Sequence, residues 1–359
     1  MRIAGIISLC VVVLAFGVGQ VNAARVWGAQ ENNLKIGQYA LDASVLAVIV
    51  NDADPTSVRI GQYYKGRRHI PVGNIIHVRF MPGSPIMSRT EFQRVKIAVD
   101  KATPAYVQAY ALAWTQPYRV ECMSITAAYA MGFDRAFCSK PCGPTKPSPY
   151  FNSNSRRPYD DYGLRPAMML AGRDYQEVKK LIDRGVASDH TFPHGTGYLV
   201  STSDKARNTR SVYYPEIIER YMKSPFDIRL VKANFIQNRK NVLFYFTGTS
   251  RVNALDSIRF VPGAIADHLT STGGALFDNK QMSILRWLEA GATGSYGTVT
   301  EPCNYPEKFP DPAIVIDRYL GGETLIEAYW QSVAWPGQGL FVGEPLAAPF
   351  APRRQNFQH

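Results

Sequence analysis

The sequence predicts an α/β fold in which a mostly parallel sheet is flanked by helices. The first observation is an apolar run at 45–50 that precedes a helical pattern and a second strand-like run at 74–80. The second is that strand-like runs and helical patterns continue to alternate along most of the chain. Such alternation is typical of parallel sheets whose faces are covered by helices.

The run at 45–50 is apolar at every position and rich in β-branched residues, as expected for a strand buried on both faces. Asp54 is expected to cap the next helix, with Pro55 in its first turn. Ile70 and Pro71 close that helix before the next strand. This β-α-β unit predicts a right-handed crossover between parallel strands.

Ser88 and Glu91 fit a capping box that opens a helix running toward Asp100. Further strands are expected at 119–125, 167–171, 197–202, 241–246 and 292–298. Further helices are expected at 174–187, 214–223, 263–270, 282–290 and 324–334. The segment 140–166 is rich in Pro, Ser, Asn, Tyr and Arg without periodicity, so we expect a long loop. Its aromatic residues suggest that it packs on the body or on a ligand, although a stapled surface excursion is an equal alternative.

The N-terminus has the features of a secretory signal peptide. Arg2 precedes an uncharged apolar run at 3–18, and Val21 and Ala23 are the small residues that signal peptidase requires. We therefore expect a signal peptide at 1–23 and a single large α/β region at 24–359. The apolar run is too short for a membrane anchor, and no transmembrane segment is expected in the mature chain. The protein is predicted to be periplasmic or extracellular.

Four of the five cysteines remain after cleavage, since Cys10 leaves with the signal. An even number in an exported chain predicts disulfides among Cys122, Cys138, Cys142 and Cys303, and three connectivities stay open. Cys138 and Cys142 resemble half of a metal site, but no second pair of ligands has suitable spacing. No metal is therefore predicted.

The formal net charge is +11, and the basic residues are spread along the chain. An anionic envelope component or extracellular polymer is the candidate partner, and no nucleic acid is expected. The sequence has no glycine-rich nucleotide fingerprint and no Walker motif, so no cofactor is predicted.

Several stretches resemble an uncharacterised family of exported bacterial proteins. These are VNDADPTSVRIGQYY at 50–64, IPVGNII at 70–76, PGAIADHLTSTGG at 262–274, GATGSYGTVTEP at 291–302 and VGEPL at 342–346. The resemblance covers nearly the whole mature chain. It implies membership of that family and supplies no reaction.

A more distant resemblance is to the caspase-like fold of gingipain-type cysteine peptidases, in the order of strands, apolar helix and glycine-rich turns. The resemblance implies a caspase-like sandwich, in which helices cover both faces of the sheet. A Rossmann-like sandwich is the alternative. Those peptidases place a histidine after one central strand and a cysteine after the next. Here 247–251 contains no histidine and 258–265 contains no cysteine, so the peptidase dyad is missing at the matching positions.

Residues that follow predicted strands are the candidates for binding, because ligands of parallel sheets lie beyond the carboxyl ends of the strands. The ligand-binding candidates are Asp52, Asp54, Asp204, Thr247, Arg251 and Glu301. The carboxylates among them, with Asp267, would form an oxygen-rich cluster if they converged. Each of these carboxylates also has a structural explanation. Asp54 fits the role of a helix cap, Asp267 could accept a hydrogen bond from a loop amide, and Glu301 could pair with an arginine.

The catalytic candidates are His268, Asp267 and Cys303. His268 adjoins Asp267 in a predicted helix and precedes Thr270 and Ser271, a set that allows acid-base or nucleophilic chemistry. A lone histidine is more often structural, and Cys303 is more readily explained as half of a disulfide. His190 and His194 stand four apart, but Pro193 disfavours the helix that a zinc pair would need.

The preferred hypothesis is an exported α/β protein of unknown activity that binds a ligand or partner at the carboxyl edge of its sheet. The alternative is a secreted hydrolase that uses Asp267, His268 and a serine, threonine or Cys303. A third possibility is an envelope-associated binding protein that uses its basic surface and the loop at 140–166.

Overall fold

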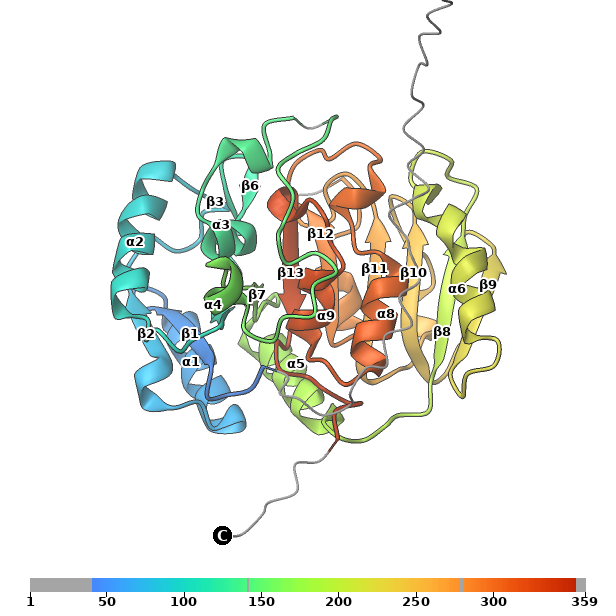
Figure 1. Cartoon of the computed structure of the whole chain (residues 1–359), viewed down its shortest axis with the longest axis horizontal. Helices are drawn as coiled ribbons and strands as arrows, with labels where there is room; N and C mark the ends of the chain where they lie inside the picture. Colours follow the sequence, from blue (N-terminus) through green and yellow to red (C-terminus); the bar gives the residue numbers. More distant parts are fainter. Residues whose placement is uncertain (1–40, 141, 278–279, 353–359) are drawn as a thin grey trace, which may run out of the picture. The chain divides into compact units, whose positions relative to one another are not determined.

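The structure, a computed structural model, describes residues 41–140, 142–277 and 280–352. A ten-stranded sheet with the order β2-β1-β4-β7-β13-β12-β11-β10-β8-β9 forms its centre (Figure 1). The predicted signal peptide lies outside the described residues. Within them, no helix combines the length and the apolar character needed to cross a membrane.

Two runs of parallel strands make up most of the sheet. The first contains β1 (Leu46–Asn51), β2 (Ile75–Val78), β4 (Ala109–Leu112) and β7 (Ala167–Met169). The second contains β8 (Thr196–Ser201), β9 (Asp227–Lys232), β10 (Val242–Gly248), β11 (Phe260–Leu269) and β12 (Gly294–Thr298). Between them lies β13 (Gly339–Gly343), which is antiparallel to β12 and joins β7 through the pair Val342 and Met169. The mostly parallel sheet is therefore confirmed.

Helices cover both faces of this sheet (Figure 1). On one face lie α1 (Pro55–Arg68), α5 (Tyr175–Ser188) and α7 (Leu285–Glu289). The helix α1 packs against α5, and Arg184 of α5 donates hydrogen bonds to the carbonyl of Leu288 in α7 and to that of Ala292. On the other face lie α2 (Arg89–Ala102), α3 (Ile125–Met131), α6 (Tyr214–Tyr221), α8 (Pro312–Leu320) and α9 (Leu325–Gln331).

The predicted β-α-β unit is present. All six residues of β1 are buried, and β1 pairs in parallel with β2. The Asp54 side chain accepts the backbone N–H of Thr56, which caps α1 as expected. Ser88 likewise caps α2 by accepting the N–H of Glu91.

Some predicted elements are wrong. The expected helix at 263–270 belongs to strand β11, whose residues 263–269 are all buried. A short apolar run buried on both faces has no periodicity that separates a strand from a helix. The expected strand at 119–125 is a small hairpin of β5 (Arg119–Val120) and β6 (Met123–Ser124), which pair beside β3 (Ile86–Met87) and lead into α3.

The long loop at 140–166 packs on the body of the protein. Tyr150 is fully buried, and the N–H of Asn152 donates to the carbonyl of Gln331 in α9. A short helix, α4 (Pro158–Tyr162), is fixed at its start because the N–H of Tyr159 donates to the side chain of Gln108. Of the alternatives for this loop, packing on the body is therefore the one observed.

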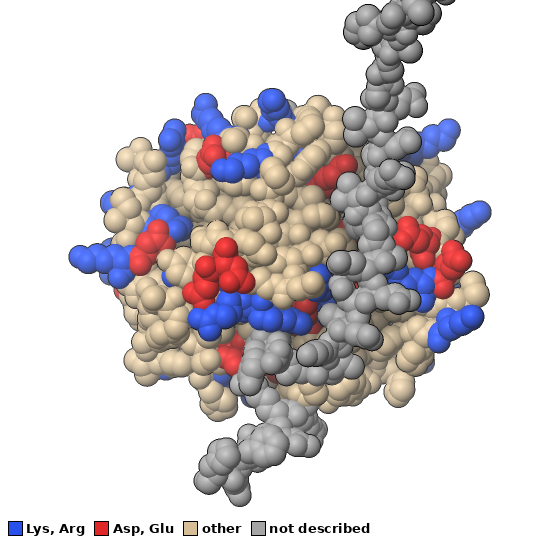
Figure 2. Space-filling view, in the orientation of Figure 1, with Lys and Arg blue, Asp and Glu red and all other residues tan. Residues whose placement is uncertain are grey.

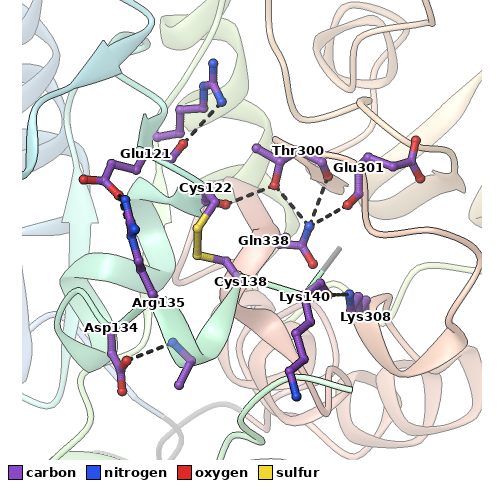
Figure 3. Close-up of a disulfide and its surroundings, with 12 residues drawn as sticks. Glu121, Cys122, Asp134, Arg135, Cys138, Lys140, Thr300, Glu301, Lys308 and Gln338 are labelled. Carbon is purple, nitrogen blue, oxygen red and sulfur yellow. Dashed lines mark hydrogen bonds and ion pairs between the residues drawn. A yellow bond between two sulfur atoms is a disulfide. The ribbon is translucent and has the colours of Figure 1, made fainter. Parts of the chain in front are cut away.

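Two disulfides connect the four cysteines, as predicted, and select one of the three open connectivities. Cys122 pairs with Cys138, and Cys142 pairs with Cys303. Figure 3 shows the first of them beside the end of β12, where the Thr300 hydroxyl donates to the carbonyl of Cys122 over 3.0 Å. The segment before the long loop is thus fastened to the carboxyl end of β12.

Candidate ligand-binding site at the carboxyl edge of the sheet

The carboxyl ends of the two parallel runs lie at one edge of the sheet. Arg173 follows β7 in the first run, and Arg251 follows β10 in the second. Both side chains line the same pocket, so the two strand ends point to a common edge. This is the edge at which parallel sheets bind ligands.

Asp52 and Asp54 lie too far along that edge to join the other candidates. Five strands separate β1 from β10 in the sheet order. At the usual spacing between strands, the two are roughly 30 Å apart. Asp52 instead pairs with His77, with 2.7 Å between the carboxylate and the ring nitrogen, and Asp54 caps α1. The carboxylates named from the sequence therefore do not form one cluster.

Asp267 and His268 point to opposite faces of the sheet. They are consecutive residues of β11, and successive side chains of a strand alternate between its faces. Asp267 contacts Arg210, while His268 contacts Trp287 of α7. They cannot act as a carboxylate and histidine pair, and the expectation that they share a helix is wrong.

The Asp267 carboxylate lies in a buried ion pair. Its Oδ1 accepts from Nη2 of Arg210 over 2.6 Å, and Arg210 also donates to the carbonyl of Thr247. Burial raises the pKa of Asp267, while the Arg210 guanidinium opposes that effect. Both residues are almost fully buried, so the pair has no access to a ligand from solvent.

His268 uses both ring nitrogens within the core. The indole N–H of Trp287 donates to Nδ1 over 3.0 Å, and Nε2 donates to the carbonyl of Met282 over 3.1 Å. Burial lowers the pKa of His268 from 6.5 to about 3, so the ring is neutral at ordinary pH. A base must accept a proton from a substrate, and no lone pair of this ring is free to do so.

Cys303 and Glu301 lie together beyond β12. The Glu301 carboxylate accepts the N–H of Cys303 over 2.7 Å, rather than pairing with an arginine. Figure 3 shows this carboxylate pointing away from the Cys122–Cys138 disulfide. Because Cys303 is bonded to Cys142, it offers no free thiol for nucleophilic catalysis.

Asp204 and Thr247 also have structural partners. The Asp204 carboxylate pairs with Arg207 over 3.0 Å and also accepts the N–H of that residue. Thr247 is fully buried in β10. Arg251, another candidate named from the sequence, lines a pocket at the carboxyl edge.

That pocket, here called the arginine pocket, has a volume of about 280 Å³. It is lined by Arg173, Arg251, Leu276, Phe277, Gln281, Met282, Ser283 and Arg286. Three of these side chains are cationic, and none is a carboxylate. The Arg251 guanidinium is exposed and has no hydrogen bond or ion pair within the described part of the chain.

The wall of the arginine pocket is built by contacts from the ends of β10 and β11. The N–H of Met282 donates to the carbonyl of Ser250, just after β10. The carbonyl of Met282 accepts from His268, which also holds Trp287, a neighbour of Arg286. His268 thus has a structural role in placing one side of the pocket.

A carboxylate outside the lining balances part of this charge. Glu289, at the end of α7, forms ion pairs with both Arg173 and Arg286. Arg286 also lies 3.5 Å from Asp256, whose side chain is 94% exposed and therefore strongly screened by water. A neighbouring hollow of about 390 Å³ shares Arg173 but has three cationic and three acidic side chains in its lining. The positive charge is therefore concentrated in the arginine pocket.

Arg173 and Arg286 were missed from the sequence. Arg173 stands four residues after Met169, so the rule that selected Arg251 could have selected it as well. Arg286 carries no such signal, because it lies on α7 and reaches the edge only through tertiary packing. On the face drawn in Figure 2, basic and acidic side chains are interspersed, so a broad basic surface is not evident there.

No protein-family model matches the chain, and no curated protein matches it. Two solved structures are similar in fold. One is a complex of the pro- and mature domains of RgpB from Porphyromonas gingivalis, with 8% identity, a TM-score of 0.49 and coverage of 84% of this chain and 79% of that chain. The other is described as the structure of a protease, with 11% identity, a TM-score of 0.49 and coverage of 86% and 79%. At these identities the likeness does not extend to residue roles.

Proposed function

We propose that this chain is an exported binding protein whose arginine pocket holds an anionic group of its ligand. The observation that supports this most directly is the concentration of Arg173, Arg251 and Arg286 around one pocket, whose lining has no carboxylate among the described residues. Guanidinium groups bind carboxylate, sulfate and phosphate through paired hydrogen bonds. Leu276, Phe277 and Met282 add an apolar wall, which favours a ligand with an apolar part next to its charge.

The surroundings of the catalytic candidates favour binding over hydrolysis. A hydrolase needs a nucleophile and a base within hydrogen-bond reach of each other. His268 is bonded at both nitrogens, Asp267 lies on the opposite face, and Cys303 is part of a disulfide. These surroundings support the binding proposal over the hydrolase alternative.

Export is part of the proposal. The signal-like N-terminus and two disulfides support an oxidising location, periplasmic or extracellular. In such a location the net charge of the chain favours an acidic extracellular partner. Protein recovered from that compartment is expected to begin at Ala24 by intact-mass analysis, and an uncleaved product alone would contradict export.

Binding is tested with small probes that share an apolar ring and differ in charge. Phenyl phosphate and phenyl sulfate supply the anions, phenol is the neutral comparison, and benzylamine is the cationic one. Calorimetry is expected to detect binding of at least one anion and of neither comparison. Equal binding of phenol, or no binding of either anion, would contradict the proposed site.

Arg251→Gln is the matching variant, because this guanidinium is exposed and has no partner at 41–140, 142–277 or 280–352. We expect it to weaken anion binding about tenfold, the effect of losing one charge-assisted contact. Arg239→Gln is the control, since it removes the same charge from an exposed position before β10, at the other edge of the sheet. An equal loss in both variants would indicate a general charge effect rather than a site.

A further inference from the structure

A second hollow lies beside the arginine pocket, between α5 and the end of α7. It has a volume of about 390 Å³ and is here called the α5 pocket. Every residue of its lining belongs to 173–184 or to 288–289, two stretches that the structure describes without a gap. The charged side chains of the lining are Arg173, Asp174, Glu177, Lys180, Arg184 and Glu289.

Four of these six charges are paired. The Lys180 ammonium contacts the Glu177 carboxylate over 2.9 Å. Glu289 accepts a hydrogen bond from Arg173 and also pairs with Arg286 outside the lining. Within the described residues, Asp174 and Arg184 form no ion pair with any other group. The pocket therefore holds one unpaired carboxylate and one unpaired guanidinium.

Arg184 is the buried member of this pair. Its Nη2 donates to the carbonyls of Leu288 and Ala292 over 3.2 and 2.6 Å. Its Nε is buried, and neither Nε nor Nη1 has a hydrogen bond within the described chain. Burial lowers the pKa of the Arg184 guanidinium from 12.5 to about 10, and the charge of Glu177 only partly opposes this effect. A ligand anion beside Arg184 would supply the opposite charge that this guanidinium lacks.

Asp174 is the exposed member, and it caps α5. Its Oδ1 accepts the N–H of Glu177 over 2.9 Å, and its Oδ2 has no partner among the described residues. A simple anion would be attracted by Arg184 and repelled by Asp174, and a simple cation would meet the reverse. A ligand that carries one charge of each sign is attracted at both positions.

We infer that the α5 pocket binds a small zwitterion, an α-amino acid, whose carboxylate contacts Arg184 and whose ammonium contacts Asp174. The rise of α5 places the Cα atoms of these two residues roughly 15 Å apart. The long arginine side chain and two charge-assisted hydrogen bonds of about 2.8 Å cover most of that distance, which leaves room for charges a few bonds apart. The inference goes beyond the proposed anion site and does not depend on it, since the two linings have Arg173 in common and differ elsewhere.

The direct test uses three probes with one carbon skeleton. These are L-alanine, N-acetyl-L-alanine, which lacks the cation, and L-alaninamide, which lacks the anion. Ligand-observed NMR titrations are made at pH 6.5, where the amines are protonated, and in the Arg251→Gln protein, which weakens anion binding in the arginine pocket. We expect L-alanine to bind about tenfold more tightly than either analogue. An analogue that binds as tightly as L-alanine, or a lack of L-alanine binding, would overturn the inference.

Asp174→Asn tests the position of the ligand by the direction of its effect. Asparagine caps a helix as well as aspartate does, so the variant keeps the start of α5 and loses the charge. It is expected to weaken L-alanine binding about tenfold. If L-alanine were bound by its carboxylate in the arginine pocket, removing a nearby carboxylate would not weaken it. Unchanged or tighter binding would therefore contradict the α5 pocket as the site.

Asp134→Asn is the control, because it removes the same charge from an exposed aspartate that caps the short helix at Arg135–Phe137. Unfolding midpoints of both variants identify any loss of folding. An equal loss of L-alanine binding in the control would indicate a general charge effect and overturn the site.

The unmodified and Arg251→Gln proteins separate this inference from the proposed function. We expect Arg251→Gln to weaken phenyl phosphate binding and to leave L-alanine binding unchanged. A parallel loss of L-alanine binding would place the amino acid in the arginine pocket, which would overturn the inference and leave the proposed anion site intact. Failure of phenyl phosphate to bind would contradict the proposed function and leave the L-alanine result unaffected.

Discussion

The side chain of His268 lies fully buried between β11 and α7, where it accepts from Trp287 and donates to Met282. Both partners belong to the segment that forms one wall of the arginine pocket. A buried donor or acceptor that loses its partner destabilises a protein by about 1 to 3 kcal/mol. The role of His268 is therefore expected to appear in stability rather than in chemistry.

His268→Leu is expected to lower the free energy of unfolding by at least about 2 kcal/mol, because the Trp287 indole and the Met282 carbonyl both lose a partner. Urea unfolding at pH 7.5 measures the change. His194→Leu, at an exposed position, is the control and is expected to have little effect. Unchanged stability of the His268 variant would contradict a structural role.

His268 is also expected to make the stability of the protein depend on pH. The folded protein holds the pKa of His268 at about 3, against an ordinary 6.5, so the unfolded chain binds a proton first as the pH falls. Stability is then lost between pH 6.5 and about 3, by about 3 kcal/mol at pH 4 relative to pH 8. The loss between these pH values is expected to be smaller in His268→Leu than in the unmodified protein.

At the scale of elements, the turn between α8 and α9 holds a buried group of charges. Glu323 contacts Arg156 over 3.1 Å and Arg318 over 3.4 Å, and Arg156 also contacts Glu327. Arg318 in turn donates to Asn152 and Asn154. The long loop is thus fixed to these helices by ion pairs as well as by the burial of Tyr150.

Through Glu323, the stability of the protein is expected to fall as the pH rises, which is opposite to the effect of His268. Burial raises the pKa of Glu323 from 4.5 to about 7, with the neighbouring Glu327 adding to the rise. Its contribution to stability is complete below pH 4.5 and is lost as the pH rises through 7, by on the order of 3 kcal/mol. Glu323→Gln is expected to reduce the loss of stability between pH 5 and 8. An unaltered profile in this variant would show that other groups cause it.

At the scale of the whole molecule, the two disulfides close loops of very different length. Cys122 and Cys138 are 16 residues apart, whereas Cys142 and Cys303 are 161 apart. A cross-link restricts the unfolded chain more strongly when it closes a longer loop. The second disulfide is therefore expected to contribute more to stability.

Replacing both cysteines of a pair by serine tests this expectation. The loss is expected to be about 3 kcal/mol for the Cys122 and Cys138 pair and about 5 kcal/mol for the Cys142 and Cys303 pair. Urea unfolding of the two double variants gives the comparison. In the unmodified protein, alkylation under denaturing, non-reducing conditions is expected to label none of the four thiols. A larger loss from the shorter loop would contradict the chain-entropy explanation.

The sequence by itself determined the elements whose signals are local. Asp54 and Ser88 cap their helices as predicted, and the apolar run before Asn51 forms a buried strand. The even number of cysteines predicted disulfides, and the rule about strand ends selected Arg251. The caps and the strand depend on neighbours within a few residues, so short-range hydrogen bonding and side-chain shape are sufficient to predict them.

Only the tertiary structure decided which of the candidate site residues lie close together. It placed Asp52 far from Arg251 through the order of the strands, and it turned Asp267 and His268 to opposite faces because their segment is a strand. It also brought Arg286 and Glu289 on α7 to the end of β7. Strand order, pairing and helix placement are set by burial of apolar surface across long sequence separations, which no local pattern records.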